Sequence, residues 1–182
     1  MRHISDVAGR ELTWIQPSAR KRDYELRAGE EVIATLHWEK GWGSLATAAS
    51  GEGRWTFKRA GFWHPHVTVR VAGSETDSAV FRAAWTGSGT LELSPTHQLR
   101  WTSANFWHSQ WTWQQADGTP LVHFKAKSGL TKIQGAVDVE AAALTLPELD
   151  LLVPLGWYLL VLYHQDSAAV GASTGAIAGT VG

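Results

Sequence analysis

Apolar and polar side chains alternate with a period of two along almost all of the chain before Leu144, and Gly-bearing turns interrupt the alternation about every ten residues. In Glu31–Trp38, for example, Val32, Ala34, Leu36 and Trp38 share one face. Side chains in a strand point alternately to its two faces, so each run predicts a strand with one buried face. Short strands separated by regular turns are typical of an antiparallel barrel or sandwich.

The pattern predicts about twelve strands and no helix before the last quarter of the chain. The predicted strands are Thr13–Gln16, Asp23–Arg27, Glu31–Trp38, Ser44–Ser50, short strands around Trp55–Phe57, Val67–Val71, Phe81–Trp85, Leu91–Leu93, Leu99–Trp101 and Trp111–Trp113, and then Leu121–Lys125 and Lys132–Val139.

The last apolar run, Leu144–Tyr163, has a different pattern, because large apolar side chains point in every direction around a helix. Such a helix must be enclosed by lipid or by protein. Its uncharged part, Leu151–Tyr163, is 13 residues long, and a membrane span needs roughly 18–20. We therefore predict a buried core helix over residues 147–163. The Ala-, Gly- and Ser-rich residues 167–182 are predicted to be a disordered tail.

Barrel geometry shows that these elements fit together. Twelve strands about 4.8 Å apart and tilted about 40° close into a barrel roughly 23 Å across. A helix with its side chains is about 10–12 Å wide, which leaves room for one layer of inward side chains. The predicted fold is mainly β: a twelve-stranded, closed antiparallel barrel that encloses a hydrophobic C-terminal helix, in a single domain over residues 1–166.

Composition and charge exclude several classes of protein. The chain has 182 residues, 11 Trp and no Cys, so disulfides, thiol catalysis and Cys-ligated zinc are excluded. The formal net charge is −1, so we expect no nucleic-acid binding, which requires a strongly basic face. All the Lys and Arg residues lie in residues 1–132, which makes that part mildly basic. The first residues contain no apolar signal segment, so we expect a cytoplasmic protein.

Two short segments and the order of elements resemble a known superfamily. Residues 55–59, Trp-Thr-Phe-Lys-Arg, lie in mid-barrel, and residues 147–150, Pro-Glu-Leu-Asp, lead into the helix. Over residues 10–164 the chain resembles the tubby C-terminal-like superfamily. The resemblance is to its phospholipid scramblase and LURP-one-related members, because the C-terminal signature of true tubby proteins is not present. It implies a non-enzymatic module, and its tubby members imply binding of phosphoinositide headgroups through basic strand residues.

Basic and aromatic residues supply the candidate ligand site. The candidate phosphate-binding residues are Arg20, Lys21, Arg22, Arg54, Lys58 and Arg59, although basic residues on outward strand faces also serve solubility and protect sheet edges. Trp42, Trp63 and Trp107 lie in predicted turns, where an indole can anchor a partner or a membrane interface.

Two short segments contain residues of the kind that bind metals, but neither has the full pattern of a metal or catalytic site. His64-Pro65-His66 has the alternate His spacing of a metal pair but lacks a following carboxylate, so we interpret it as a turn. Glu148 and Asp150 lie where scramblases carry acidic residues in a calcium-associated segment. Two carboxylates are too few for calcium, and acids at a helix N-terminus complement the helix dipole. We predict no metal, no cofactor and no catalytic residue.

The sequence therefore favours a non-enzymatic binding or scaffold module that contacts anionic phospholipid, another phosphate-bearing ligand or an unknown protein, peripherally at a membrane. Two alternatives stay open. One is a tail-anchored protein in which Leu144–Tyr163 spans the bilayer. The other is a small-molecule enzyme that uses the His64/His66 region.

Overall fold

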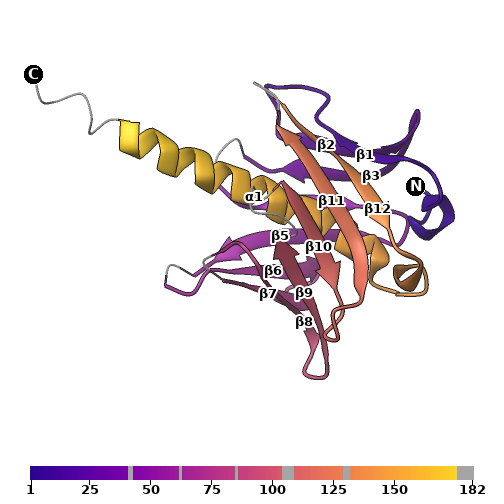
Figure 1. The fold of residues 1–182 in the computed structure, drawn as a ribbon. Helices are drawn as coiled ribbons and strands as arrows, with labels where there is room; N and C mark the ends of the chain where they lie inside the picture. Colours follow the sequence, from indigo (N-terminus) through magenta and orange to yellow (C-terminus); the bar gives the residue numbers. More distant parts are fainter. Residues whose placement is uncertain (41–42, 62, 85, 104–108, 129–131, 176–182) are drawn as a thin grey trace, which may run out of the picture.

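Twelve antiparallel strands close into a barrel around a C-terminal helix in the computed structural model, which describes residues 1–40, 43–61, 63–84, 86–103, 109–128 and 132–175 (Figure 1). The predicted fold class is confirmed. The strands are β1 (Leu12–Ile15), β2 (Asp23–Ala28), β3 (Glu31–Trp38), β4 (Ala46–Ala49), β5 (Arg54–Ala60), β6 (His66–Val71), β7 (Ala79–Ala83), β8 (Gly89–Ser94), β9 (His97–Ser103), β10 (Gln110–Gln114), β11 (Pro120–Ser128) and β12 (Ile133–Val139).

Each strand pairs with its neighbours in sequence, and β1 pairs with β12 to close the barrel, with Leu12 opposite Val137. In such a meander, successive connections alternate between the two ends. The β1–β2, β3–β4, β5–β6, β7–β8, β9–β10 and β11–β12 connections share one end, which we call the exit end. The other connections, the N-terminal segment and the start of the helix share the capped end.

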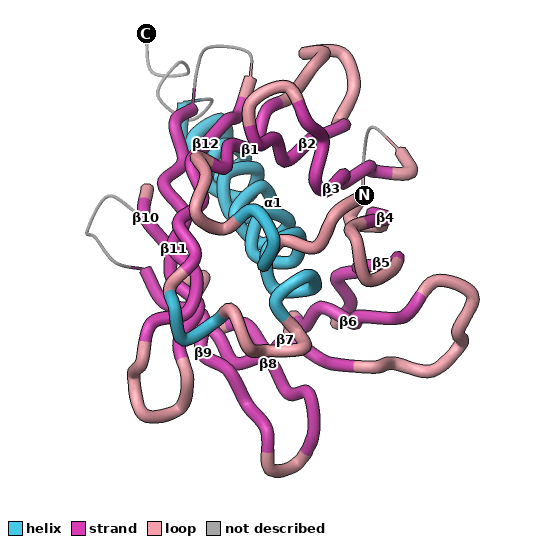
Figure 2. Tube along the Cα trace, turned by 90° about the vertical axis from the view of Figure 1, so that its right-hand side faces the viewer, coloured by secondary structure: helices cyan, strands magenta, loops and turns pink. Residues whose placement is uncertain are grey.

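The helix α1 (Leu149–Gly175) runs along the inside of the barrel, with strands on all sides of it (Figure 2). Its mid-section is buried in every direction: Leu160 is 0% and Leu159 is 7% exposed, although they lie on adjacent faces. Aromatic rings fill the gap to the wall, since Trp157 stacks on Trp14 and Tyr158 on Trp38, with ring centroids 5.7 and 5.2 Å apart. The helix is therefore the centre of the core, as its pattern predicted.

The helix packs closely against the wall at Gly156. A Cβ atom added there would lie 2.5 Å from Cζ of Phe124 and 2.9 Å from Nε1 of Trp113. The same Trp113 Nε1 donates a hydrogen bond of 2.9 Å to the carbonyl oxygen of Leu152. One side of the barrel thus packs directly on the helix backbone.

The helix ends at Gly175, whereas the sequence predicted an end at residue 163 and a disordered tail over 167–182. The segment beyond the barrel is rich in Ala, which has the highest helix propensity, and this favours continuation of the helix. Residues 176–182 lie outside the described residues. Figure 1 shows the last turns projecting from the exit end.

Two short 3-10 helices close the capped end. These are η1 (Ser5–Val7) before β1 and η2 (Ala141–Ala143) between β12 and α1. Ile4, Val7 and Ala143 are buried there. The helix therefore starts under a lid of apolar side chains and leaves through the opposite end.

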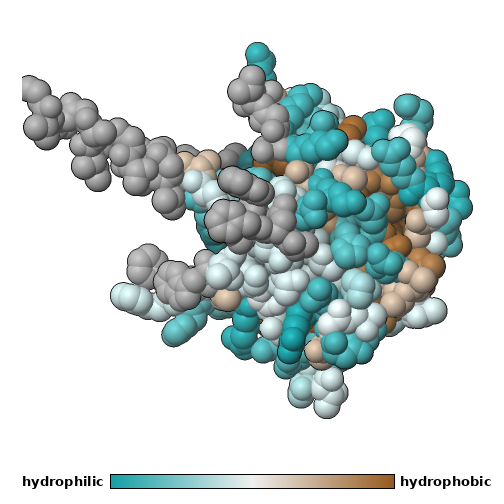
Figure 3. All heavy atoms as spheres, viewed as in Figure 1, coloured by the Kyte–Doolittle hydropathy of each residue, from teal (hydrophilic) through white to brown (hydrophobic). Residues whose placement is uncertain are grey.

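The outer wall is largely polar in the view of Figure 3. The predicted inward residues Phe57, Val69 and Phe81 are buried. Val71 was also predicted to face inward but is 50% exposed, because it is the last residue of β6. Trp85 lies outside the described residues.

Candidate functional site

The two ends of the barrel carry opposite charge. The six connections at the exit end contain five bases and one acid, namely Arg20, Lys21, Arg22, Lys40, Lys132 and Glu39. The six connections at the capped end, counting β12–α1, contain seven acids and no Lys or Arg: Glu30, Glu52, Glu75, Asp77, Asp117, Glu140 and Glu148. The N-terminal segment at the same end adds two acids and two bases, Asp6, Glu11, Arg2 and Arg10, so this end remains acidic. An anionic partner is therefore attracted to the exit end and a cation to the capped end.

A group of exposed cations lies where the β1–β2 and β11–β12 connections meet. Lys132 Nζ donates a hydrogen bond of 3.1 Å to the carbonyl oxygen of Pro17, which brings it beside the segment that holds Arg20 and Lys21. All three side chains are exposed, as is that of Lys40 in the β3–β4 connection. We call Arg20, Lys21, Lys40 and Lys132 the basic rim.

Arg22 and Arg59 are engaged in the protein. Arg22 donates to the carbonyl of Gly43 and lies 4.4 Å from the ring centroid of Trp38. Arg59 pairs with Asp166 of the emerging helix at 2.6 Å. These two predicted ligand residues stabilise the exit end through contacts within the protein. The positive charge that remains available to a ligand at this end is that of the basic rim.

Burial dominates the electrostatics just inside this end. It lowers the pKa of Arg22, raises the pKa of Tyr24 to about 12, and raises the pKa of Tyr158 well above its usual range. Tyr158 donates a hydrogen bond of 2.5 Å to the carbonyl of Ser44. Both tyrosines therefore stay neutral at physiological pH and act as packing groups.

The remaining predicted cations lie elsewhere. Arg54 is the first residue of β5 and so belongs to the capped end, while Lys58 is exposed on the wall of the same strand. The structure brings Arg20, Lys21 and Arg22 together and leaves Arg54 at the far end of the barrel.

An exposed tryptophan belongs to the exit end. Trp63, in the β5–β6 connection, is 80% exposed and lines a pocket of about 330 Å³ with His64, Pro65, His66 and Arg82. The prediction that Trp63 is exposed is confirmed. Trp42 and Trp107 lie outside the described residues.

The His64/His66 pair shows little of a metal site. His66 Nδ1 lies 3.1 Å from the carbonyl oxygen of His64, a hydrogen bond that occupies one ring nitrogen. Within the described part of the chain, no third His or carboxylate joins the pair into a ligand group. The interpretation of a turn with two imidazoles describes this geometry.

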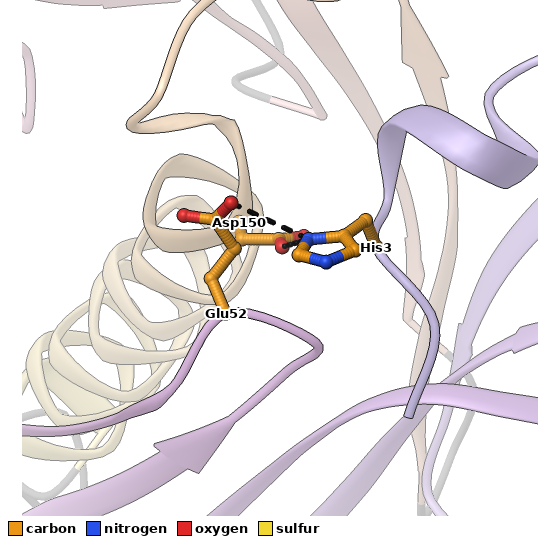
Figure 4. Close-up of side chains that lie close together, drawn as sticks. All are labelled: His3, Glu52 and Asp150. Atoms are coloured by element: carbon orange, nitrogen blue, oxygen red, sulfur yellow. Dashed lines mark hydrogen bonds and ion pairs between the residues drawn. The ribbon is translucent and has the colours of Figure 1, made fainter.

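A cluster that sequence reasoning missed lies at the capped end. His3 Nδ1 is 3.2 Å from Asp150 Oδ2 and 3.4 Å from Glu52 Oε1, and Figure 4 shows both carboxylates directed at the imidazole. Asp150 was expected to complement the helix dipole. It also accepts a hydrogen bond of 2.9 Å from the Ile4 N–H, so it ties the N-terminal segment to the helix. The three residues lie too far apart in sequence to form a motif.

Comparison with known proteins gave no matching family model, no matching curated protein and no matching solved structure. The resemblance to the tubby C-terminal-like superfamily therefore stays a prediction. Within the described residues, no helix has both the length and the apolar character needed to cross a membrane.

Proposed function

We propose that the protein is a non-enzymatic binding module that attaches peripherally to anionic phospholipid surfaces through the exit end of its barrel. The observation that carries the proposal is the coincidence of the basic rim and the exposed Trp63 at one end, with the acids gathered at the other. This orientation turns the cations toward an anionic surface and the acids away from it. The resemblance to the tubby C-terminal-like superfamily, whose tubby members imply binding of phosphoinositide headgroups, supports the same proposal.

The filled interior supports a surface role. Leu152, Trp157 and Tyr158 are fully buried inside the barrel, so the helix takes up the space in which a lipocalin-like barrel would hold a ligand. A ligand must then meet the outside of the barrel or one of its ends. Of these surfaces, the exit end has the charge that suits phosphate groups.

Two kinds of contact contribute to attachment. Each Lys or Arg near an anionic membrane contributes about 1 kcal/mol, so the four residues of the basic rim together supply roughly 4 kcal/mol. An indole prefers the headgroup level of a bilayer, which gives Trp63 a place in the same interface. The chain after Asp166 contains no charged side chain, so it adds no acid that would repel an anionic surface at this end.

Sedimentation with liposomes tests the proposal. The protein should sediment with phosphatidylserine-containing vesicles and not with pure phosphatidylcholine, and salt should release it, since exposed charges are screened. Changing Arg20, Lys21 and Lys132 together to Ala should weaken binding roughly 100-fold, from a loss of about 3 kcal/mol. Trp63→Ala should weaken it further.

A matched control removes the same charge elsewhere. The triple variant Arg54→Ala, Arg70→Ala and Lys125→Ala changes net charge equally but leaves the basic rim intact, and it should bind anionic vesicles almost as well as the parent. Equal sedimentation with both vesicle types, no binding to either, or an equal loss in the control triple would each refute the proposal.

A further inference from the structure

Three segments that are distant in sequence bring metal-ligating side chains together at the capped end (Figure 4). His3 comes from the N-terminal segment, Glu52 from the β4–β5 connection and Asp150 from the first turn of α1. One potential ligand atom from each of the three residues lies within 4.8 Å of the other two.

The separations match those of a metal coordination sphere. Zinc binds His nitrogen and carboxylate oxygen at about 2.0–2.2 Å, so neighbouring ligand atoms lie roughly 3–3.6 Å apart. His3 Nδ1 is 3.2 Å from Asp150 Oδ2 and 3.4 Å from Glu52 Oε1. Glu52 has a side chain that is 45% exposed, so its terminal torsions can adjust to bring its oxygen closer to that of Asp150.

The negative charge around His3 also favours binding of a cation. A single ring nitrogen carries at most one hydrogen, so His3 Nδ1 cannot donate a full hydrogen bond to both carboxylates. Two carboxylates therefore share one imidazole nitrogen. The connections and the N-terminal segment at this end together contain nine acids and two Arg residues, Arg2 and Arg10, and both Arg side chains pair with Glu31. A divalent ion between the three side chains would balance the group.

The cluster is built into the fold. Asp150 is 4% exposed, and its Oδ1 accepts the Ile4 N–H, which leaves Oδ2 directed at His3. Next to Glu52, a Cβ atom added at Gly51 would lie 2.6 Å from the carbonyl oxygen of Arg2. The glycine therefore lets the β4–β5 turn pack directly on the N-terminal segment, and this contact holds Glu52 beside His3.

A pocket of about 240 Å³ adjoins the three side chains, and Ser5 and Thr145 also line it. It has room for water at the positions that three protein ligands leave open, as in zinc sites that keep an exchangeable ligand. Calcium suits the group less well, because it prefers six to eight oxygen ligands and this set contains a nitrogen.

We propose that His3, Glu52 and Asp150 bind a divalent first-row transition metal such as Zn²⁺, with the remaining coordination positions open to the pocket. The site is independent of lipid binding at the exit end. It departs from the sequence-based prediction of no metal, because the three ligands are separated by long stretches of chain.

Metal titration of the full chain, purified without a His-tag and stripped with chelator, tests this site. After dialysis against ZnCl₂ the protein should hold one Zn²⁺ per chain, and Zn²⁺ should raise Tm, because an ion that binds the native state stabilises it. His3→Gln and Glu52→Gln should each lower Zn²⁺ affinity at least about 10-fold, since even the loss of an outer-shell partner costs 10–100-fold. Ca²⁺ in excess should not displace Zn²⁺.

Two controls separate the site from general acidity. Glu30→Gln removes an exposed acid at the same end, and His97→Gln removes a histidine that pairs there with Glu148. Both should retain full affinity. The proposal is wrong if Zn²⁺ is substoichiometric, if the controls lose as much affinity as His3→Gln and Glu52→Gln, or if Ca²⁺ competes as well as Zn²⁺. The two test positions are exposed, so their variants should fold; circular dichroism before metal addition verifies this.

Discussion

At the scale of single residues, the contact between the helix and the wall at Gly156 leaves no room for a side chain. Phe124 and Trp113 occupy the space in which any larger side chain would project. In sequence this glycine looks like a weak point, because Gly lowers helix propensity by about 1 kcal/mol relative to Ala. In the structure it is a position at which the helix backbone packs directly against side chains of the wall.

Gly156→Ala should therefore destabilise the protein, even though Ala favours helix. Overpacking a core costs about 1–3 kcal/mol, which outweighs the propensity gain of about 1 kcal/mol, so we expect a net loss of up to about 2 kcal/mol. Urea denaturation measures it. Gly9→Ala is the control, because an added Cβ at Gly9 meets nothing within 4 Å. An increased urea midpoint for Gly156→Ala would contradict the prediction and show that Phe124 and Trp113 can move to accommodate the methyl group.

At the scale of elements, α1 changes environment as it leaves the barrel. Tyr163 still contacts Trp111, with ring centroids 5.2 Å apart. His164 is half-buried, and its Nε2 has no hydrogen-bond partner among the described residues. Beyond it, Asp166 pairs with Arg59 at the mouth of the barrel. The exit of the helix is thus held by an aromatic contact and an ion pair on either side of a half-buried imidazole.

Burial lowers the pKa of His164 below its ordinary value of 6.5. The unfolded chain then takes up this proton at a higher pH than the folded chain does, so stability should fall as pH drops from above 6.5 towards the lower folded pKa. Thermal unfolding between about pH 8 and pH 5 measures the decline. His164→Gln should flatten part of it, whereas His64→Gln, at an exposed position, should not. Parallel curves for all three proteins would contradict this role of His164.

At the scale of the whole molecule, helix and barrel form one cooperative unit. Every strand is paired on both sides, and the helix mid-section has no exposed face. The helix cannot leave without opening the barrel, and the barrel cannot stay closed over an empty interior, because the cavity would be far larger than a core tolerates.

Native-state hydrogen exchange should show this coupling. The backbone amides of residues 155–160 should exchange only through global unfolding and be among the slowest in the chain, whereas those after Ser167 should exchange much faster. Mass spectrometry of peptides from these two regions measures the difference. Faster exchange in 155–160 than in the strands would show that the helix can slide out of a closed barrel.

Much of this architecture could be predicted from the sequence. The period-two alternation is a local property of strands, and a run with apolar residues on all sides can be recognised as an enclosed helix from its own residues. Exposure of Trp63 followed from its place between Gly61 and Pro65. The end of the helix was placed too early, because Ala- and Ser-rich sequence suits both a coil and a projecting helix.

The sequence by itself determined the strands, the enclosed helix and the filled barrel, because each depends on the spacing of neighbouring side chains. The tertiary structure alone decided which residues meet. It engaged Arg22 and Arg59 within the protein, placed Arg54 at the end away from Arg20, and joined His3, Glu52 and Asp150. The physical reason is that a meander sends alternate connections to opposite ends, so which distant residues share an end is known only once the strand order and the closure of β1 on β12 are known.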